Sequence, residues 1–261
     1  MSQAKIIKTV QWNIGGGKVR DPAADINVLA SYATDGLEVI ITQLKLLEPD
    51  IITLQEIHAD DMLNQVEAIA KALGLPYFVS DFYADSHVEA GQKLGQGIIS
   101  RFPLSGHTFV LFKNPKLSIT WEDGGTATSH DKGVTSCILQ IGDVSLMVKT
   151  LHSVPFRRFQ VDPMTETGQA ILADMRAKLE SPEPHLLIQG DFNLNFDRYK
   201  PVWPQLFSGQ LMEIPQEMPT TPKGRKYDHV LYRGLTPKES SAIEPRALTD
   251  HFPVVTIFEI D

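Results

Sequence analysis

Short apolar runs that end in polar side chains recur from one end of the sequence to the other. A polar residue at the end of a buried strand is costly unless it meets partners, so this repeated pattern favours strand ends that share one polar site. The polar residues at these ends are Asn13, Glu56, His152, Asp191, Asn193, Asp228, Asp250 and His251. We therefore expect a fold that brings these ends to a common edge.

The order of the apolar patterns predicts mixed β-sheets with helices on the outside. Pro49 closes the first helical region, which holds one or two helices. Hairpins together with crossover connections imply sheets with both parallel and antiparallel neighbours. Because no linker, repeat or low-complexity tract interrupts the chain, we expect one domain over residues 1–261. Helices are expected within 25–50, 60–76 and 164–180, and a hairpin over 133–153.

The charge balance and the single cysteine limit the classes of protein that fit this sequence. The 261 residues carry a formal net charge of −8, which argues against a protein that coats nucleic acid but leaves room for a local basic rim. Cys137 is alone, so no intramolecular disulfide can form. The first residues lack a signal-peptide pattern, and no run of 18 apolar residues exists. We expect a cytoplasmic protein without a membrane span, with secretion and the oligomeric state left open.

The run from Gly190 to Asn193 predicts how one strand can serve both the core and a cleft. Residues two apart in a strand face the same side, so Asp191 and Asn193 are expected to face the cleft while Phe192 turns into the core. Gly190 is expected to let the backbone bend. Asn195, two residues further on, is expected to be only a turn residue.

Seven motifs in a fixed order carry a resemblance to a known family. In this order, from residue 10 to residue 254, the sequence resembles the endonuclease/exonuclease/phosphatase superfamily. The resemblance implies an α/β fold, a four-layer sandwich in which two mixed β-sheets pack face to face with helices outside. The motifs are VQWNI (10–14), DIITLQE (50–56), GQGIISRFPL (95–104), TLHSVPF (150–156), QGDFN (189–193), YDHVLY (227–232) and TDHFPV (249–254).

The ligand chemistry of the polar residues predicts a site for Mg²⁺ or Mn²⁺. Hydrolysis of a phosphate ester needs a hard cation, and carboxylate and amide oxygens are the ligands that such cations prefer. No cluster of cysteine and histidine offers a zinc site instead. Glu56 is expected to be the primary ligand, with Asn13 and Asp250 nearby.

The resemblance also implies a catalytic role for each remaining polar residue. His251 would be the base that activates water, oriented by Asp228. Asp191 would orient the water or help to deprotonate it, and Asn193 would donate to the phosphoryl oxygens. His152 would be the second histidine of the deoxyribonuclease-like and sphingomyelinase-like branches, where it donates to a phosphoryl oxygen or the leaving group.

Gly15 departs from the pattern of some DNA-repair branches of the superfamily. Those branches carry an aspartate two residues after the motif asparagine, and here that position is Gly15 in NIGGGK. The missing carboxylate weighs against a DNA-repair role, and His152 also points to the branch with two histidines.

Basic and aromatic residues near the motifs predict a rim that contacts a phosphorylated substrate. The aromatic residues Phe156 and Phe159 interleave with basic ones and could contact a nucleobase or a lipid head group, whereas Trp12 and Phe192 are expected in the core. Charged loops are also common without any such role. The basic residues near predicted site residues are Lys18, Arg20, Arg157, Arg158, Lys223, Arg225 and Lys226.

These features favour a divalent-metal-dependent phosphodiesterase, a nuclease or a nucleotide-type enzyme. A phospholipid esterase or a sugar-phosphate or inositol-phosphate esterase of the same superfamily is the enzymatic alternative. A phospholipase needs an exposed apolar loop, and 109–121 is the one candidate, although it fits a buried hairpin equally well. The alternative from another class is a binding module that kept the fold and lost catalysis, which the full set of polar residues disfavours.

Overall fold

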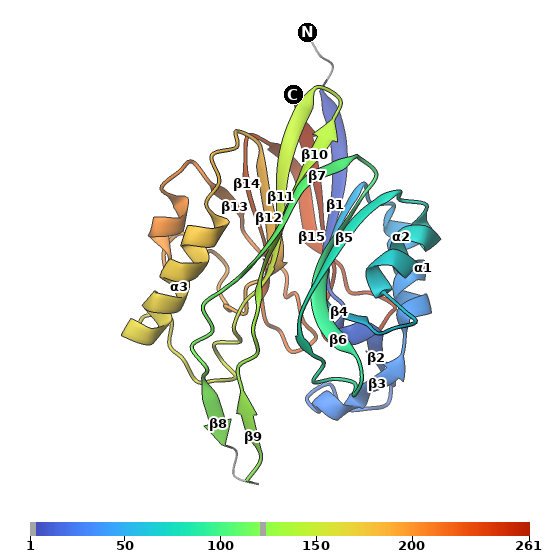
Figure 1. The fold of residues 1–261 in the computed structure, drawn as a ribbon, viewed down its shortest axis with the longest axis vertical. Helices are drawn as coiled ribbons and strands as arrows, with labels where there is room; N and C mark the ends of the chain where they lie inside the picture. The colour runs from blue at the N-terminus through green and yellow to red at the C-terminus, as the bar shows by residue number, and fades with distance from the viewer. Residues whose placement is uncertain (1–3, 121–123) are drawn as a thin grey trace.

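The computed structural model describes residues 4–120 and 124–261, and two six-stranded mixed sheets dominate it (Figure 1). The first sheet has the order β15–β16–β1–β4–β6–β5, with β1 at Lys5–Asn13, β4 at Ile51–Ala59, β5 at Tyr77–Asp85, β6 at Lys93–Ser100, β15 at Thr236–Ala242 and β16 at Val254–Ile260. The second has the order β13–β14–β12–β11–β10–β7, with β7 at Leu104–Leu111, β10 at Gly133–Ile141, β11 at Val144–His152, β12 at Leu186–Asp191, β13 at Met212–Ile214 and β14 at Asp228–Arg233. Each sheet has one parallel pair, β1 with β4 and β11 with β12.

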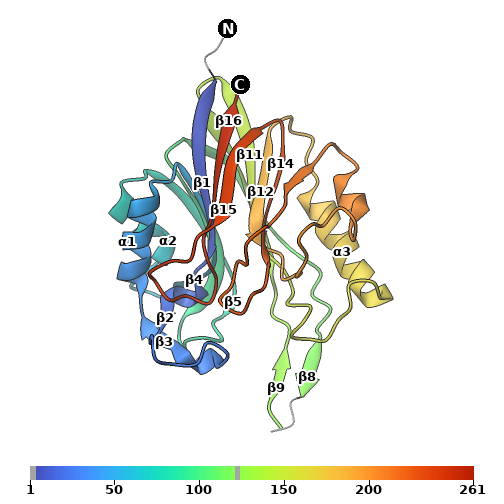
Figure 2. The same cartoon turned by 180° about the vertical axis from the view of Figure 1, so that it is seen from behind.

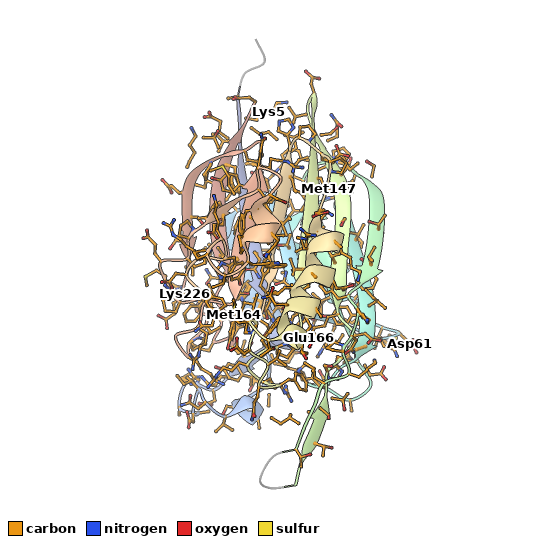
Figure 3. All side chains as sticks on the ribbon, turned by 90° about the vertical axis from the view of Figure 1, so that its left-hand side faces the viewer. Lys5, Asp61, Met147, Met164, Glu166 and Lys226 are labelled. Atoms are coloured by element: carbon orange, nitrogen blue, oxygen red, sulfur yellow. The ribbon has the colours of Figure 1, made fainter. Side chains whose placement is uncertain are left out.

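Helices cover the outer face of each sheet, which makes four layers. The helices α1 (Leu37–Leu47) and α2 (Gln65–Leu73) cover the first sheet, and α3 (Glu166–Leu179) covers the second (Figures 1 and 2). Figure 3 looks onto α3, with Glu166 at its start and the second sheet behind it. The expected four-layer α/β sandwich is confirmed.

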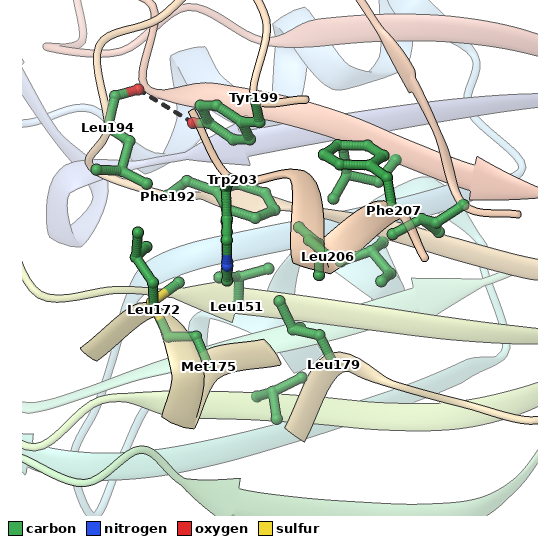
Figure 4. Packing of buried hydrophobic residues seen from close by; sticks show 14 of the residues in the cluster. Leu151, Leu172, Met175, Leu179, Phe192, Leu194, Tyr199, Trp203, Leu206 and Phe207 are labelled. Atoms are coloured by element: carbon green, nitrogen blue, oxygen red, sulfur yellow. Dashed lines mark hydrogen bonds between the residues drawn. The ribbon is translucent and has the colours of Figure 1, made fainter. Parts of the chain in front are cut away.

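Three clusters of buried apolar side chains fill the three interfaces between the layers. One lies between the sheets and joins Ile7 and Ile98 to Leu146 and Leu187. A second packs α1 and α2 on the first sheet. The third packs α3 on the second sheet, and Figure 4 shows Trp203 at its centre. Removing this much apolar surface from water is the main term that holds the layers together.

The helix expected within 25–50 is shorter than its region. Two short strands, β2 (Lys18–Arg20) and β3 (Tyr32–Asp35), form a ribbon before α1. The helix then ends at Leu47, because Glu48 adopts a left-handed conformation with φ 48°. The other two expected helices, α2 and α3, lie within their predicted regions. At the start of α2 the Asn64 side chain accepts from Val66 N and Glu67 N, and Gly74 caps its end.

The segment 109–121 divides between the edge of the sheet and a small hairpin. Val110 and Leu111 are exposed on β7, whereas Phe112 packs into the cluster under α3. Beyond them, β8 (Ser118–Thr120) pairs with β9 (Thr126–Thr128) in a hairpin that projects from the end of the molecule opposite the termini (Figure 1). Trp121 lies outside the described residues. Among the described residues, no helix has the length and apolar character needed to cross a membrane.

Buried glutamines hydrogen-bond across the space between the sheets, close to the ends of the strands. Gln11 Nε2 donates to Gln55 Oε1 at 2.6 Å, and Gln55 Nε2 donates to Thr150 Oγ1 of the opposite sheet at 2.8 Å. Gln189 Nε2 of the second sheet donates to Thr9 Oγ1 of the first at 2.9 Å. The inter-sheet layer is therefore apolar at the end near the termini and polar where the strands reach the site.

Gly190 serves a close approach of two strands, which corrects the expected bend. It pairs with Leu151 in the parallel register of β11 and β12, and a Cβ at this position would lie 2.2 Å from the Leu151 carbonyl oxygen. The residue stays in the strand and does not adopt a positive φ. A side chain is excluded here by the neighbouring backbone.

We predict that Gly190→Ala destabilises the fold by about 1–3 kcal/mol or more, since backbone atoms have to move to make room. The matched control is Gly209→Ala, where the added Cβ would meet only the end of the Arg233 side chain at 3.6 Å. Urea unfolding at equilibrium measures both. Equal midpoints for the two variants would contradict the close approach.

Candidate active site

The strand registers bring the predicted polar residues to one end of the sandwich. Asn13 pairs with Gln55 across β1 and β4, and Asp191 pairs with both His152 and Asp228 across the second sheet. A cavity of about 740 Å³ opens at this end. The predicted residues that line it are Glu56, His152, Arg158, Asp191, Asn193, Asp250 and His251. Asn13 and Asp228 are fully buried and do not line the cavity. They hydrogen-bond to residues that do, Asn13 to Asp191 and Asp228 to His251.

Asp228 and His251 form a hydrogen-bonded carboxylate–imidazole pair. His251 Nδ1 donates to Asp228 Oδ2 at 2.8 Å, and Gln11 Nε2 donates to the other carboxylate oxygen at 3.0 Å. Burial disfavours the imidazolium, but Asp228 and Asp191 outweigh it and raise the pKa of His251 well above its ordinary value. The Trp12 indole donates to the His251 carbonyl at 3.0 Å. The imidazole is thus fixed from both sides with Nε2 left toward the cavity.

Asp191 lies between this pair and the rest of the site. Its Oδ2 is 3.8 Å from His251 Nε2 and accepts from Asn13 Nδ2 at 3.1 Å. Burial raises the pKa of the Asp191 carboxyl to about 7, with the Asp228 charge adding to it. The Asn13 amide oxygen accepts from Gly15 N at 3.0 Å, so Asn13 orients Asp191 with one end and shapes the glycine loop with the other.

Glu56 enters the cavity from an irregularity in β4. The pairing of β4 with β6 shifts register between Gln55 and Ile57, and Glu56 has φ 50°. Such a bulge turns a side chain away from the regular alternation of a strand. Burial raises the pKa of the Glu56 carboxyl, but the positive charge of the basic groups around it, Lys132 among them, outweighs burial and lowers the pKa.

His152 is held by two residues that sequence reasoning missed. The Tyr83 hydroxyl lies 3.2 Å from Nδ1, and the Lys132 ammonium contacts Nε2. Burial, with the Lys132 charge, lowers the pKa of His152 well below its ordinary value. A neutral ring that accepts from Lys132 carries its proton on Nδ1, so Nε2 has no proton to donate. The role expected of His152 as a donor therefore stays a prediction, and Lys132 is the residue with spare N–H groups.

One feature of the sequence could have indicated Lys132 as a site residue: it lies directly before the apolar strand β10. Its side chain is buried, and burial lowers its pKa to about 8 although Glu56 and Asp191 favour the charged form. Tyr83 had no comparable signal, because it lies within a regular strand pattern. Both residues line hollows at the site, Lys132 in the main cavity.

Asp250 lies against the glycine loop that departs from the repair-branch pattern. A Cβ at Gly15 would lie 2.9 Å from Asp250 Oδ1, and Gly15 has φ 53°. Burial raises the pKa of the Asp250 carboxyl. The glycine thus leaves room for Asp250 at the cavity wall, where a larger residue would displace it.

Two sets of side chains could hold a divalent cation. Ligand atoms of Asp191, Asp228 and His251 lie within 4.8 Å of one another. Asp228 and His251 already hydrogen-bond to each other, however, whereas Glu56 and Asp250 line the cavity outside this pair. A further carboxylate of the wall, Glu89, pairs with Lys18. Burial raises the pKa of both Asp191 and Asp250, which means that the protein compensates their negative charge poorly. Hard oxygen donors in need of positive charge fit Mg²⁺ or Mn²⁺.

The predicted run from Asp191 to Asn195 is partly corrected. β12 ends at Asp191, and Asn193 reaches the cavity because it adopts a left-handed conformation with φ 53°, not by strand alternation. Its backbone N–H donates to Asp191 Oδ1 at 2.8 Å. Phe192 is fully buried as expected. The Asn195 side chain accepts from Lys226 N at 2.9 Å, which joins two segments far apart in the sequence.

The basic residues predicted to form a rim separate into two groups. Arg158 lines the cavity, while its neighbour Arg157 is exposed and does not. Lys18 also lines the cavity and pairs with Glu89 at 2.8 Å. Arg20 instead donates to carbonyl oxygens of its own loop.

The basic cluster before Asp228 lies away from the cavity lining. Lys226 Nζ pairs with Asp197 at 2.8 Å, and Lys223 Nζ donates to the Asn27 carbonyl at 3.5 Å. Arg225 is half-buried beside them. Substrate contacts by these three residues stay a prediction.

The aromatic residues divide differently from the expectation. Phe156 packs in the core under α3, which corrects its expected place in a substrate platform, because the chain turns its side chain inward before the two arginines. Phe159 lines the cavity. Trp12 is buried as expected.

A family model of the endonuclease/exonuclease/phosphatase family matches residues 10–251. The chain belongs to this family. Family members are generally hydrolases of phosphoester bonds and typically use a divalent metal. A comparison with curated protein sequences found no match.

Solved structures of family proteins share the fold at low sequence identity. An endonuclease/exonuclease/phosphatase from Beutenbergia cavernae has a TM-score of 0.74 at 16% identity, over 98% of this chain and 72% of that one. ANGEL2, a 2′,3′-cyclic phosphatase in complex with adenosine-2′,3′-vanadate, has a TM-score of 0.63 at 13% identity, over 98% and 96%. D. rerio TDP2 complexed with a single-strand DNA product has a TM-score of 0.60 at 15% identity, over 97% and 98%.

We predict that Gly15→Ala weakens the rise in melting temperature that Mg²⁺ or Mn²⁺ produces, because the added Cβ displaces Asp250 from the wall. The control is Gly74→Ala, which has the same left-handed conformation with φ 68° and open space around it. Both variants lose about 1 kcal/mol through conformation, but only Gly15→Ala loses the response to metal. If metal raises the melting temperature of Gly15→Ala as much as that of the wild type, Asp250 is not a metal ligand.

Proposed function

We propose that the protein is a divalent-metal-dependent phosphodiesterase that acts on nucleic acid or a nucleotide-type ester. The observation that carries the proposal is the Asp228–His251 pair, which opens toward Asp191 in the same cavity as the carboxylates of Glu56 and Asp250. The cavity wall therefore holds a base (His251), a carboxylate that orients water (Asp191) and oxygen ligands for a hard cation (Glu56 and Asp250). Hydrolysis of a phosphodiester needs these three functions together.

The carboxylate–imidazole pair activates the attacking water. Water held between His251 Nε2 and Asp191 Oδ2, which are 3.8 Å apart, gives its proton to the imidazole. Asp228 holds the ring by its bond to Nδ1 and stabilises the imidazolium that forms. Asn13 keeps Asp191 turned toward the water.

Glu56 and Asp250, together with Asp191, would hold the cation. When bound, Mg²⁺ or Mn²⁺ supplies positive charge to the phosphoryl oxygens. The amide oxygen of Asn13 is engaged by Gly15 N, so Asn13 contributes through Asp191. A bound cation would offset part of the negative charge that raises the pKa of His251, so more of the imidazole would be unprotonated and able to take the proton of the water.

Asn193 and Lys132 would bind the phosphoryl oxygens. Both line the cavity, and both present N–H donors beside Asp191 and Glu56. Donors held in place by buried surroundings stabilise charge that develops in the transition state. His152 fixes the position of Lys132 by the contact at Nε2.

The structural neighbours support a substrate with a nucleotide-type ester. TDP2 has been solved with a single-strand DNA product and ANGEL2 with an adenosine vanadate. In this chain, Arg158, Lys132 and Lys18 place basic groups around the cavity of a protein with a net charge of −8. Basic groups beside the carboxylates of the cavity attract phosphate esters locally.

We predict that EDTA abolishes hydrolysis of bis(p-nitrophenyl) phosphate and that Mg²⁺ or Mn²⁺ restores it. His251→Ala should lower kcat by about 10²–10⁴-fold, because it removes the base. His107→Ala is the control, as His107 pairs with Asp81 outside the cavity. Circular dichroism checks that the variants fold. Activity that survives chelation, or a mild effect of His251→Ala, contradicts the proposed chemistry.

We predict that Arg158→Ala raises KM for an oligonucleotide by about tenfold, the effect of losing one charged contact to phosphate. Arg157→Ala is the matched control, since this arginine is adjacent in sequence but lies outside the cavity lining. Steady-state kinetics at fixed ionic strength measure both variants. Equal KM values would remove Arg158 from the substrate site.

A further inference from the structure

Two histidines line the cavity but take no part in the proposed catalysis. His87 comes from the loop between β5 and β6, and His130 from the residues between β9 and β10. Their rings stack with centroids 5.3 Å apart and planes at 26°. No hydrogen bond between described residues engages a nitrogen of either ring. The ring faces hold each other in place while the nitrogens stay available for a ligand.

The stacked pair is the wall between the catalytic cavity and a second hollow. The second hollow has a volume of about 640 Å³ and shares His87, Ala127, Thr128, His130 and Arg158 with the first. Strand β9 of the projecting hairpin forms one side of both. The site therefore continues past the catalytic groups into a longer groove, which offers more space than a single phosphoryl group fills.

Ion pairs flank this wall in both hollows. Lys116 pairs with Asp131 at 2.9 Å in the second hollow, and Lys18 pairs with Glu89 at 2.8 Å in the first. Arg158 lines both hollows, and it adds positive charge beside the two imidazoles. The Arg158 guanidinium and the two imidazoles thus lie along the stretch of wall that both hollows share. Guanidinium and imidazole N–H groups that converge in this way suit a phosphate.

We propose that His87, His130 and Arg158 form a second phosphate subsite, so that the preferred substrate carries another phosphate next to the one that is cleaved. This inference rests on the proposed phosphodiesterase function. Imidazole N–H groups and the guanidinium donate to the second phosphate while the scissile one lies at Asp191 and Glu56. The second phosphate belongs either to a polynucleotide or to a small molecule with two phosphates.

The first test compares substrates that differ by one phosphate. The wild type should cleave a thymidine dinucleotide with an added terminal phosphate at least tenfold better in kcat/KM than the same dinucleotide without it. The double variant His87→Phe/His130→Phe keeps the ring stack and removes the N–H groups. In this variant, kcat/KM with the added phosphate should lie within about twofold of kcat/KM without it. His107→Phe, outside the cavity, should keep the full ratio. A ratio near one in the wild type would overturn the subsite.

The second test measures binding without catalysis. Calorimetry in EDTA should show adenosine 3′,5′-bisphosphate bound at least tenfold more tightly than adenosine 5′-monophosphate, with the gain lost in the double phenylalanine variant. A gain that survives in that variant overturns the phosphate subsite and assigns the rings to a nucleobase instead. If binding shows the gain but no phosphodiester is cleaved, the subsite stands and the proposed catalysis fails.

A third comparison identifies the source of the second phosphate. Binding of a 5′-phosphorylated oligonucleotide is compared with binding of inositol 1,4-bisphosphate, each against its monophosphorylated counterpart. Tighter binding of the phosphorylated oligonucleotide than of its counterpart supports a polynucleotide as substrate. Tighter binding of the inositol bisphosphate than of its counterpart supports a small bisphosphate. A gain in neither overturns the subsite.

Discussion

The buried hydrogen bonds between the two sheets are the constraint on which the site depends. Gln11 donates to Gln55 and to Asp228, and Gln55 donates to Thr150 in the opposite sheet. Apolar packing alone would leave the sheets free to slide, because it is not directional. A hydrogen bond between buried groups fixes both distance and register, and a broken one leaves an unsatisfied group at a cost of about 1–3 kcal/mol. The Asp228 carboxylate, the partner of His251, is therefore held in part by a strand of the other sheet.

The sequence allowed the layers and the strand ends to be predicted, because both follow from local patterns. The alternation of apolar runs and turns identified the sheets, and the polar endings identified Glu56, Asp191 and His251 at the cavity. The resemblance supplied the pairing of Asp228 with His251, which the structure shows at 2.8 Å. None of these predictions required knowledge of how distant loops pack.

Residues that reach the site through three-dimensional packing could not be predicted in the same way. Lys132 and Tyr83 meet at His152 from different strands, and His87 and His130 meet from different loops. Phe156 was misplaced because its basic neighbours suggested a surface loop, whereas the backbone turns its ring into the core. The left-handed conformation of Glu56 has no signal in residue type, whereas that of Asn193 is one that asparagine adopts more readily than most residues. Such conformations cost energy locally, and surrounding contacts have to hold them.

The position of β16 ties together two residues of the site that lie far apart in the sequence. This strand lies inside the first sheet, between β15 and β1, and pairs with β1 from Lys5 to Gln11 (Figure 2). His251 lies just before β16, whereas Gln11, at the end of the paired stretch of β1, donates to Asp228, the partner of His251. A substitution that loosens β1 from β16 would therefore disturb both members of the carboxylate–imidazole pair, although it lies in neither of them.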